Sequence, residues 1–515
     1  MSGLSDWRIP KRQWVRLLLG AALALYGLSV GFCSVRRFQT YHAATFDLGY
    51  FSQVVWNTAN GRWFETTISR STSSELIGNY LGEHVTPVLM LIAPLYRLWP
   101  DPRLLLVLQT AGVASGALPL FALARRVTGK RTHALIVALG YLAYPALGFV
   151  NLFDFHPIAL SIPAVFLAAW ALEEGRGTVF WAAVLLALFT KEELVVPLGA
   201  WAATMVFRAD KRRTGARLLG LVAIWAVVSI GVIIPRFNEG EGYKFLGLWS
   251  RLPWISAAPA QAGVAQATGP ASAQAVVLFL VHLFLPLGFL PFLGLHAFIV
   301  ALPSLAYLLL GQRAAFHSVG YHYPAVLIPW LFLAVVEGMR CLKNSPAGRA
   351  SRYRRLGLIG LLAGTLGTNL VLNPFALSAK AGFFQRPSYH EHVDEALARI
   401  PKNAAVSVVN RFGPHLANRR ILVALEYPPP LRLEHVKMTD YVLLDLVDCR
   451  TVPAANQREA FARMVKQILD SGSFRVDLWE DRILLLEKGS PTEGELSQIR
   501  AYVDRLVEED RPCWP

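Results

Sequence analysis

Charged side chains are scarce in this chain. Asp, Glu, Lys and Arg make up only 17% of its 515 residues, whereas soluble domains usually carry about 25%. Hydrophobic residues make up 54%. So few charges in so long a chain leave too little polar surface to face water, which excludes an ordinary soluble protein.

Cysteine is also scarce, and the four residues stand far apart, at positions 33, 341, 449 and 513. None has a CxxC or other metal-ligand spacing, so the cysteines predict no zinc or redox motif. Phe32 precedes Cys33 where a lipoprotein cleavage site needs a small residue, so residues 1–30 are predicted to be an uncleaved first span. Cys449 and Cys513 would be able to pair if their domain is extracytoplasmic.

Long apolar runs fill the chain as far as about residue 374, for example at 14–30, 104–123, 218–234 and 323–336. A membrane-spanning helix needs roughly 20 mostly apolar residues, because each residue advances the helix by about 1.5 Å. These runs predict an all-α polytopic membrane domain over residues 1–374.

The net charge of +15 could indicate a nucleic-acid partner. The Lys and Arg residues, however, stand in short loops between apolar segments, which is the positive-inside pattern of a membrane protein. We therefore expect the lipid bilayer, and no nucleic acid, as a partner. Arg8, Lys11, Arg12 and Arg16 predict a cytoplasmic N-terminus.

The loops then predict about eleven spans. They are expected at 14–34, 103–125, 132–150, 158–173, 178–190, 194–208, 218–235, 274–292, 295–311, 323–342 and 356–373. All five basic clusters fall on the cytoplasmic side, although only the first was used to set the orientation. A long polar loop at 35–84 contains an amphipathic helical pattern at 47–60. Segment 85–99 is interrupted by prolines and is predicted to be a short or re-entrant helix at the outer face.

The character of the chain changes after residue 375. Apolar runs shorten to strand length at 404–409, 441–446, 475–478 and 482–486, and amphipathic helical patterns occur at 455–471 and 491–509. This alternation predicts a small soluble α/β domain over residues 375–515, which the order of the spans places outside the cell membrane. It has no glycine-rich phosphate loop and no nucleophile motif, so we expect it to cap the membrane domain or to bind a partner.

Ionisable residues at membrane depth are costly to bury and are usually functional. Those in or beside the predicted spans all fall on the outer side, in five separate loops. They are Asp47, Glu83, His84, Asp154, His156, Lys191, Glu192, Glu193, His317 and His322. Their common side predicts one polar site at the outer interface.

Asp47 begins a helical pattern just outside the first span. Such a carboxylate is either a helix N-cap or a general base that orients or deprotonates an acceptor hydroxyl. Two further pairs, Glu83 with His84 and Asp154 with His156, have side chains that suit a divalent metal or a phosphate. These four residues are candidates for a metal site, although the sequence makes no cofactor certain.

Lys191 and Glu192 interrupt an apolar stretch. They are either an interfacial ion pair or functional groups, with Lys191 binding an anionic phosphate and Glu192 serving the reaction centre. His322 stands between two tyrosines that would otherwise be ordinary residues of an interfacial aromatic belt. We expect His322 to form a hydrogen bond with a phosphate or a sugar.

Several short motifs together resemble the bacterial membrane family catalogued as domain of unknown function 2079. They are Phe46-Asp47-Leu48-Gly49, Gly82-Glu83-His84-Val85-Thr86-Pro87, Ala93-Pro94-Leu95-Tyr96, Phe153-Asp154-Phe155-His156-Pro157, Thr190-Lys191-Glu192 and His322-Tyr323. Singly these motifs are weak, but together they are specific, and the resemblance covers most of the chain. Glu83 departs from the family pattern, which has an Asp beside the histidine.

The layout is also similar to that of the GT-C class of membrane glycosyltransferases. That class has a cytoplasmic N-terminus and a catalytic acid in a long first outer loop, and it takes sugar from a polyprenyl-phosphate carrier. The resemblance implies a multi-pass protein of the bacterial cytoplasmic membrane with its carboxyl-terminal domain outside. It makes Asp47 the match of the first-loop acid and Asp154 the match of a second acid after the third span.

The leading hypothesis is therefore an inverting transfer of sugar from a polyprenyl-phosphate donor to a glycan, lipid or protein acceptor, with or without a divalent metal. Asp47, Asp154 and Glu192 would be catalytic, and the substrate would be held by Glu83, His84, His156, Lys191 and His322. A transporter or flippase for a lipid-linked or small anionic substrate is the alternative, although the halves of the chain show no repeat. A non-catalytic scaffold is a third possibility, and it predicts that the charged residues do not converge in space.

Overall fold

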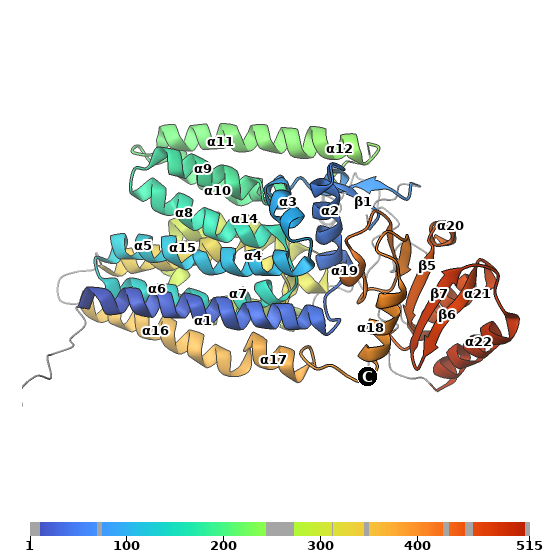
Figure 1. Ribbon diagram of the computed structural model, residues 1–515. Helices are drawn as coiled ribbons and strands as arrows, with labels where there is room; N and C mark the ends of the chain where they lie inside the picture. Colours follow the sequence, from blue (N-terminus) through green and yellow to red (C-terminus); the bar gives the residue numbers. More distant parts are fainter. Residues whose placement is uncertain are drawn as a thin grey trace, which may run out of the picture.

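A bundle of long helices stands beside a five-stranded sheet in the computed structural model (Figure 1). The structure describes residues 11–68, 75–240, 242–243, 272–311, 313–343, 350–425, 432–448 and 457–509. Cys449 and Cys513 lie outside these ranges, so their pairing stays open.

Each of the eleven segments expected to span the membrane contains a helix. The bundle consists of α1 (Lys11–Gln39), α4 (Pro102–Ser115), α5 (Ala117–Thr128), α6 (Arg131–Leu142), α7 (Pro145–Leu152), α8 (Ser161–Glu173), α9 (Gly177–Leu188), α10 (Val195–Val206), α11 (Arg212–Ala226), α12 (Ile234–Phe237), α13 (Ala273–Phe284), α14 (Leu295–Leu310), α15 (Ile328–Lys343), α16 (Ala350–Val371) and α17 (Pro374–Lys380). Short turns of helix join several of them: η3 (Pro157–Leu160), η4 (Glu192–Leu194), η5 (Val227–Ile233), η7 (Leu285–Leu287), η8 (Leu290–Leu293), η9 (Ala314–His317) and η10 (Tyr323–Val326).

Among the described residues, four helices are long and apolar enough to cross a membrane. They cover Gln13–Gln39, Pro102–Thr128, Arg212–Phe237 and Ser351–Lys380. The pair α6 and α7 makes a fifth span if its 44° bend is bridged, and five further apolar helices are shorter. Leu28 and Leu370 are 75% and 89% exposed, as expected of side chains that face lipid. The chain is thus a membrane protein, and the number of eleven spans stays a prediction.

Helix α15 runs through the middle of the bundle. Every residue from 328 to 336 is buried, which is the pattern of a helix that is covered on all sides. Its Phe332 meets Tyr141 and Tyr144 edge-on at ring distances of 5.4 Å. At Gly294, just before α14, an added Cβ would lie 2.1 Å from the carbonyl oxygen of Ala334, so glycine allows the backbones to touch there.

The long loop between α1 and α4 folds into short elements across one end of the bundle. These are η1 (Thr45–Gly49), α2 (Tyr50–Ala59), β1 (Glu65–Thr66), β2 (Gly78–Asn79), η2 (Tyr80–Gly82) and α3 (Val88–Leu98). Helices η1 and α2 cover the helical segment expected at 47–60, and α3 is the short helix expected at 85–99. Most of α2 is buried, including the polar residues Ser52, Gln53 and Asn57, so the structure does not show it as an amphipathic helix at a surface. The return into the bundle is fixed by Asp101, whose carboxylate accepts the N–H of Arg103 while Pro102 begins α4.

The carboxyl-terminal part contains a mixed sheet in the order β4-β3-β5-β7-β6. Its strands are β3 (Val406–Val408), β4 (Leu422–Ala424), β5 (Tyr441–Asp445), β6 (Phe474–Glu480) and β7 (Ile483–Lys488), and its helices are α18 (His390–Arg399), α19 (Gly413–Leu416), α20 (Leu433–Lys437), α21 (Gln457–Asp470) and α22 (Glu493–Glu508). Strands β4, β3 and β5 are parallel, and β7 pairs antiparallel with both β5 and β6. Four of the five strands coincide with the apolar runs, whereas β4 was not expected. The domain boundary at residue 375 stays a prediction.

The segment that follows β3 packs directly on η1. The N–H of Thr45 donates to the carbonyl oxygen of Asn410 at 2.9 Å, and a Cβ at Gly413 would lie 2.0 Å from Thr45 Oγ1. Beside this contact His415 stacks on Phe38 with ring centroids 4.1 Å apart. Burial lowers the pKa of His415 to about 4, so the ring that fills this junction is neutral at ordinary pH.

Candidate active site

A cavity of about 390 Å³ lies at the end of the bundle that faces the sheet. Its volume falls in the range of sites for small ligands. Its walls come from η1 and α2, η2, the loops before η3 and η4, and the segment from α14 to η10. Seven of the ten ionisable residues predicted for one site line this Asp47 cavity: Asp47, Glu83, His84, His156, Lys191, Glu193 and His322. The other three, Asp154, Glu192 and His317, are buried and do not line it.

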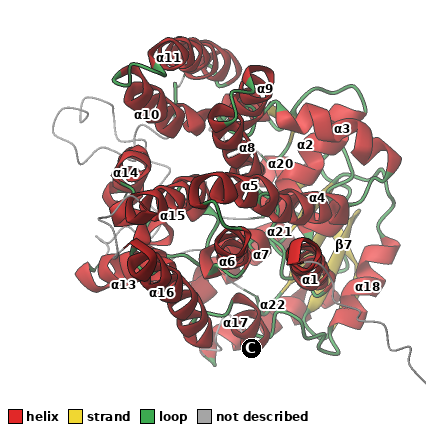
Figure 2. Cartoon of the chain, turned by 90° about the vertical axis from the view of Figure 1, so that its left-hand side faces the viewer, coloured by secondary structure: helices red, strands yellow, loops and turns green. Residues whose placement is uncertain are grey.

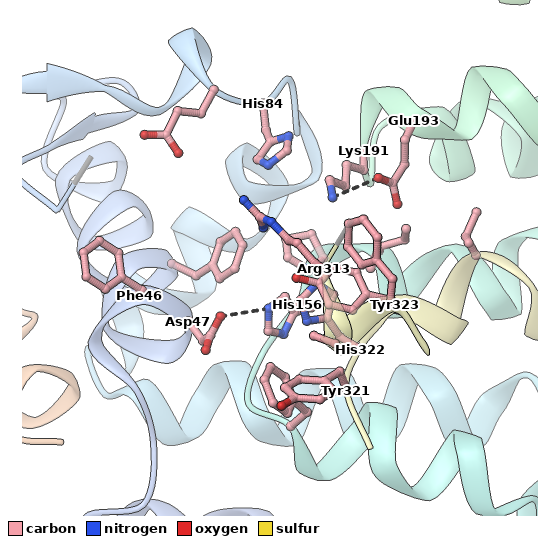
Figure 3. Close-up of a pocket in the computed structure, with 18 of the residues that line it drawn as sticks. Phe46, Asp47, His84, His156, Lys191, Glu193, Arg313, Tyr321, His322 and Tyr323 are labelled. Carbon is pink, nitrogen blue, oxygen red and sulfur yellow. Dashed lines mark hydrogen bonds and ion pairs between the residues drawn. The ribbon is translucent and has the colours of Figure 1, made fainter. Parts of the chain in front are cut away.

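Asp47 lies in η1, which is a π-helix. Widened turns of this kind are frequent at functional sites. Neither η1 nor α2 has a side-chain cap, so capping is not what holds this segment. The Asp47 carboxylate instead accepts a hydrogen bond from His156 Nε2 at 3.2 Å (Figure 3).

His156 is held from two further directions. Its backbone N–H donates to Gln109 Oε1 at 2.7 Å, and its ring stacks on His322 with centroids 3.6 Å apart and planes 14° from parallel. The Nδ1 atom is buried and has no hydrogen-bond partner among the described residues. An ionised carboxylate can only accept a hydrogen bond, so the contact with Asp47 requires a proton on Nε2.

Asp154 lies behind the cavity and is not among the residues that line it. Its carboxylate accepts hydrogen bonds from Arg37 Nη1 at 3.0 Å and from the N–H of Ala44 at 2.9 Å. Its backbone is left-handed, with φ of 73°, which turns the side chain away from the direction that His156 takes. Burial raises the pKa of Asp154 to about 6, against the lowering effect of Arg37. Asp154 thus fixes the end of α1 to the loop that carries Asp47.

Glu192 also lies behind the cavity, and its side chain is fully buried. Its carboxylate accepts hydrogen bonds from His84 Nδ1 at 2.7 Å, from the N–H of Val85 at 3.0 Å and from the hydroxyl of Tyr243 at 2.8 Å. Burial alone would raise the pKa of Glu192, but His84, Lys191 and the Val85 N–H outweigh it and lower the pKa to about 2. Glu192 therefore orients His84, which does line the cavity.

Lys191 forms its ion pair with Glu193, not with Glu192. The distance from Lys191 Nζ to Glu193 Oε2 is 3.0 Å, and both side chains line the cavity (Figure 3). Burial would lower the pKa of Lys191, but the two neighbouring carboxylates raise it, so its ammonium group stays charged. A charged ammonium group beside a cavity suits an anionic ligand.

Arg313 was missed by the sequence analysis. It stands between α14 and η9 and lines the cavity, and its Nε atom is buried without a hydrogen-bond partner in the described part of the chain. In Figure 3 its guanidinium group lies between His84 and Lys191 on one side and the Asp47–His156 pair on the other. An arginine in a predicted outer loop, where basic residues are rare, was the signal that would have found it.

The four metal candidates do not form one group. Asp154 turns to Arg37, His156 to Asp47 and His84 to Glu192, while Glu83 lines the cavity. Among the residues that the structure describes, no group of three or more His, Cys, Asp and Glu side chains is placed to hold a metal ion. No metal is therefore assigned to any of these four residues.

The fold is similar to that of ArnT from Cupriavidus metallidurans. The structure of ArnT bound to undecaprenyl phosphate matches with a TM-score of 0.52 at 14% sequence identity, over 93% of this chain and 98% of ArnT. The apo structure of ArnT matches with a TM-score of 0.52 at 16% identity, over 92% and 98%. Identity this low shows the fold alone, and it confirms the GT-C-like fold that the motifs implied.

A comparison with curated protein sequences gives no match to this chain. The profile of a family of predicted membrane proteins, DUF2079, matches residues 37–485. This range includes every residue that lines the Asp47 cavity and all but the end of the last strand of the sheet. The chain belongs to the DUF2079 family of predicted membrane proteins.

Proposed function

We propose that this protein is a GT-C-type glycosyltransferase that transfers a sugar from a polyprenyl-phosphate donor to an acceptor on the extracytoplasmic side of the membrane. One observation carries the proposal: a carboxylate, Asp47, and two cationic side chains, Lys191 and Arg313, line one cavity at the end of an apolar helix bundle. The undecaprenyl phosphate bound to ArnT is a ligand of the chemistry that such a cavity suits.

The chemistry is a single displacement. The acceptor oxygen attacks the anomeric carbon of the sugar from the side opposite the phosphate, and Asp47 takes the proton of the acceptor hydroxyl. The bond between the anomeric carbon and the phosphate oxygen breaks, and that oxygen leaves with the electron pair. Lys191 and Arg313 hold the negative charge that develops on the phosphate. His156 orients the Asp47 carboxylate through its Nε2–H.

The structure supports a division of labour among the predicted acids. Asp154 and Glu192 were both expected to act at the reaction centre, but neither lines the cavity. We assign both to positioning, Asp154 of the Asp47 loop and Glu192 of His84. His84 and His322 stay candidates for hydrogen bonds to the phosphate or the sugar, since both line the cavity.

The transfer is tested with the purified protein in lipid nanodiscs. A panel of undecaprenyl-phosphate sugars is supplied together with bacterial membranes as the source of acceptor, and release of undecaprenyl phosphate is measured. We expect release from at least one donor by the native protein and none above background by Asp47→Asn. Asp470→Asn, an exposed Asp of α21, is the matched control and should keep full activity.

The same experiment separates the alternatives. Full release by Asp47→Asn would refute the role of Asp47 as the base. Passage of intact donor across a liposome membrane without release of the carrier would instead establish the transporter or flippase. Absence of both activities, with every donor in the panel, would leave the scaffold as the better description.

The phosphate site has a test of its own. Undecaprenyl phosphate should raise the thermal midpoint of the native protein, and undecaprenol, which lacks the phosphate, should raise it much less. Arg313→Gln and Lys191→Gln should each remove most of the difference, because each deletes a cation of the cavity lining. Equal stabilisation by the two lipids would contradict a phosphate site.

A further inference from the structure

A second cavity, of about 120 Å³, lies at the opposite end of the bundle, between α5, α8, α10, α14 and α15. Figure 2 looks onto this end of the molecule, with the sheet on the far side. The two cavities share no lining residue. We call it the Glu173 cavity, after a carboxylate of its lining.

The Glu173 carboxylate is shared by two cations. Lys211 Nζ lies 3.2 Å from Glu173 Oε1, and Arg340 Nη2 lies 3.1 Å from Glu173 Oε2. The lining holds one further cation, Arg208, and one further carboxylate, Glu337. Three cations and two carboxylates leave the lining with a surplus of one positive charge, and Arg208 also lies 3.5 Å from the exposed Asp210. The cavity therefore favours an anion.

The second carboxylate of the lining, Glu337, contacts the first residues of α14. Its Oε2 atom accepts the N–H of Ala297 at 2.8 Å, and its Oε1 atom lies 2.9 Å from His296 Nδ1. A carboxylate at a helix N-terminus satisfies an N–H group that has no partner within the helix. Glu337 is thereby held at the start of α14, while Lys211 and Arg340 line the cavity and pair with Glu173.

The rest of the wall is apolar and includes Leu123, Trp201, Leu333 and Val336. A cavity of about 120 Å³ has room for a group as small as a phosphate. Basic sites between spanning helices, at the level of the lipid headgroups, are typical places for anionic lipids.

We propose that the Glu173 cavity binds the phosphate group of an anionic membrane phospholipid through Lys211 and Arg340. A phosphodiester has one negative charge, which balances the one surplus positive charge of the cavity lining. The apolar wall favours a phosphate that is part of a lipid over free phosphate. This site is independent of sugar transfer, because it lies at the other end of the bundle from Asp47.

Native mass spectrometry of the purified protein tests the proposal. The protein is incubated with phosphatidylglycerol, with zwitterionic phosphatidylcholine and with inorganic phosphate. The native protein should retain one phosphatidylglycerol more strongly than either of the others. The double variant Lys211→Gln, Arg340→Gln should lower that retention about tenfold or more, as expected for the loss of charge-assisted hydrogen bonds. The matched control is Arg355→Gln, an exposed arginine of α16 at the same end, which should retain the lipid fully.

Glu173→Gln separates lipid binding from a purely structural role. It removes the carboxylate that competes for Lys211 and Arg340, so retention of phosphatidylglycerol should rise. A purely structural ion pair would make Glu173→Gln and the double variant lose lipid together, which would overturn the proposal. Equal retention of phosphatidylcholine, or binding of inorganic phosphate with no retention of phosphatidylglycerol, would overturn it as well. Undecaprenyl phosphate binding in the Asp47 cavity should be unchanged in all these variants.

Discussion

The lining of the Asp47 cavity and the layer of side chains directly behind it use the same residue types in different ways. The side chains of Asp47 and Glu193, in the lining, are 22% and 24% exposed. Those of Asp154 and Glu192, in the layer behind, are 4% and 0% exposed and accept hydrogen bonds from backbone N–H groups. Adjacent acids in one motif can therefore have separate tasks, one toward the substrate and the other toward the scaffold.

The largest expected difference between the two layers concerns catalysis. Asp47→Asn should lower sugar transfer by about 10²- to 10⁴-fold, the usual contribution of a general base, and leave the thermal midpoint unchanged. The rate is measured as release of the carrier, and the midpoint by thermal unfolding in detergent. A large loss of stability in Asp47→Asn would show that the lining also acts as scaffold and would remove the distinction.

The free energy of unfolding should depend more on the acids of the buried layer than on those of the cavity lining. Glu192→Gln should destabilise the fold by about 1.5 to 3 kcal/mol, the usual worth of hydrogen bonds to a charged group, because His84, Val85 and Tyr243 all donate to this carboxylate. Glu193→Gln, whose side chain is partly exposed, is the control and should have a smaller effect. The free energy of unfolding is measured by reversible denaturation. Equal losses in the two variants would mean that burial does not separate the two layers.

The pH dependence of stability should distinguish the two buried acids, Asp154 and Glu192, from each other. Asp154 has a folded pKa of about 6, above its ordinary value of 3.8. The folded state therefore binds this proton more tightly, and its contribution to stability falls as the pH rises from about 4 to about 6. Asp154→Asn should remove this slope, which is measured as the difference between the thermal midpoints of the native protein and the variant across that range. Parallel curves would contradict the raised pKa.

Glu192 should give the opposite slope. Its folded pKa of about 2 lies below the ordinary value of 4.5, so its stabilising effect is complete above pH 4.5 and is lost as the pH falls toward 2. Thermal midpoints of the native protein and of Glu192→Gln should converge over that interval. A gap that stays constant down to pH 2 would argue against an ionised Glu192.

The smallest expected effect belongs to Tyr243, which donates one of the hydrogen bonds to Glu192. Tyr243→Phe should cost about 1 kcal/mol, since the carboxylate keeps its bonds to His84 and Val85. The thermal midpoint of this variant, compared with that of Glu192→Gln, measures the share of one donor. A loss as large as that of Glu192→Gln would make Tyr243 the main support of the buried layer.

Much of this arrangement could be predicted from the sequence, because apolar runs and basic loops are properties of whole segments. The apolar runs predicted the helices of the bundle. The ionisable residues were all predicted on one side of the membrane, and Asp47, His84, His156 and Lys191 do line one cavity. The division between lining and buried layer could not be predicted. It depends on backbone direction inside short loops, such as the left-handed residue Asp154, which no periodic pattern encodes.

The sequence analysis also missed Arg313 and strand β4, and it proposed a metal site that the structure does not show among the described residues. Arg313 is one cation among 50 Lys and Arg residues, and only its outer position distinguishes it. Strand β4 lies in a short apolar run at 421–425, which is the same signal that located β3 and was overlooked. The metal candidates were chosen by side-chain type alone, whereas a metal site requires several ligand atoms close to one point. In the structure His84 instead contacts Glu192, and Asp154 contacts Arg37.

The contact between Thr45 and Asn410 also bears on how the protein is made. The two residues are separated by 365 positions, so a ribosome completes Thr45 early in synthesis and Asn410 late. Before Asn410 and Gly413 are made, the π-helix that carries Asp47 lacks two contacts. These are the Asn410 carbonyl oxygen, which accepts the N–H of Thr45, and the backbone of Gly413, on which Thr45 packs. An unfinished chain has the candidate base but not its support. The η1 segment therefore gains this support only after the chain has been translated past Gly413.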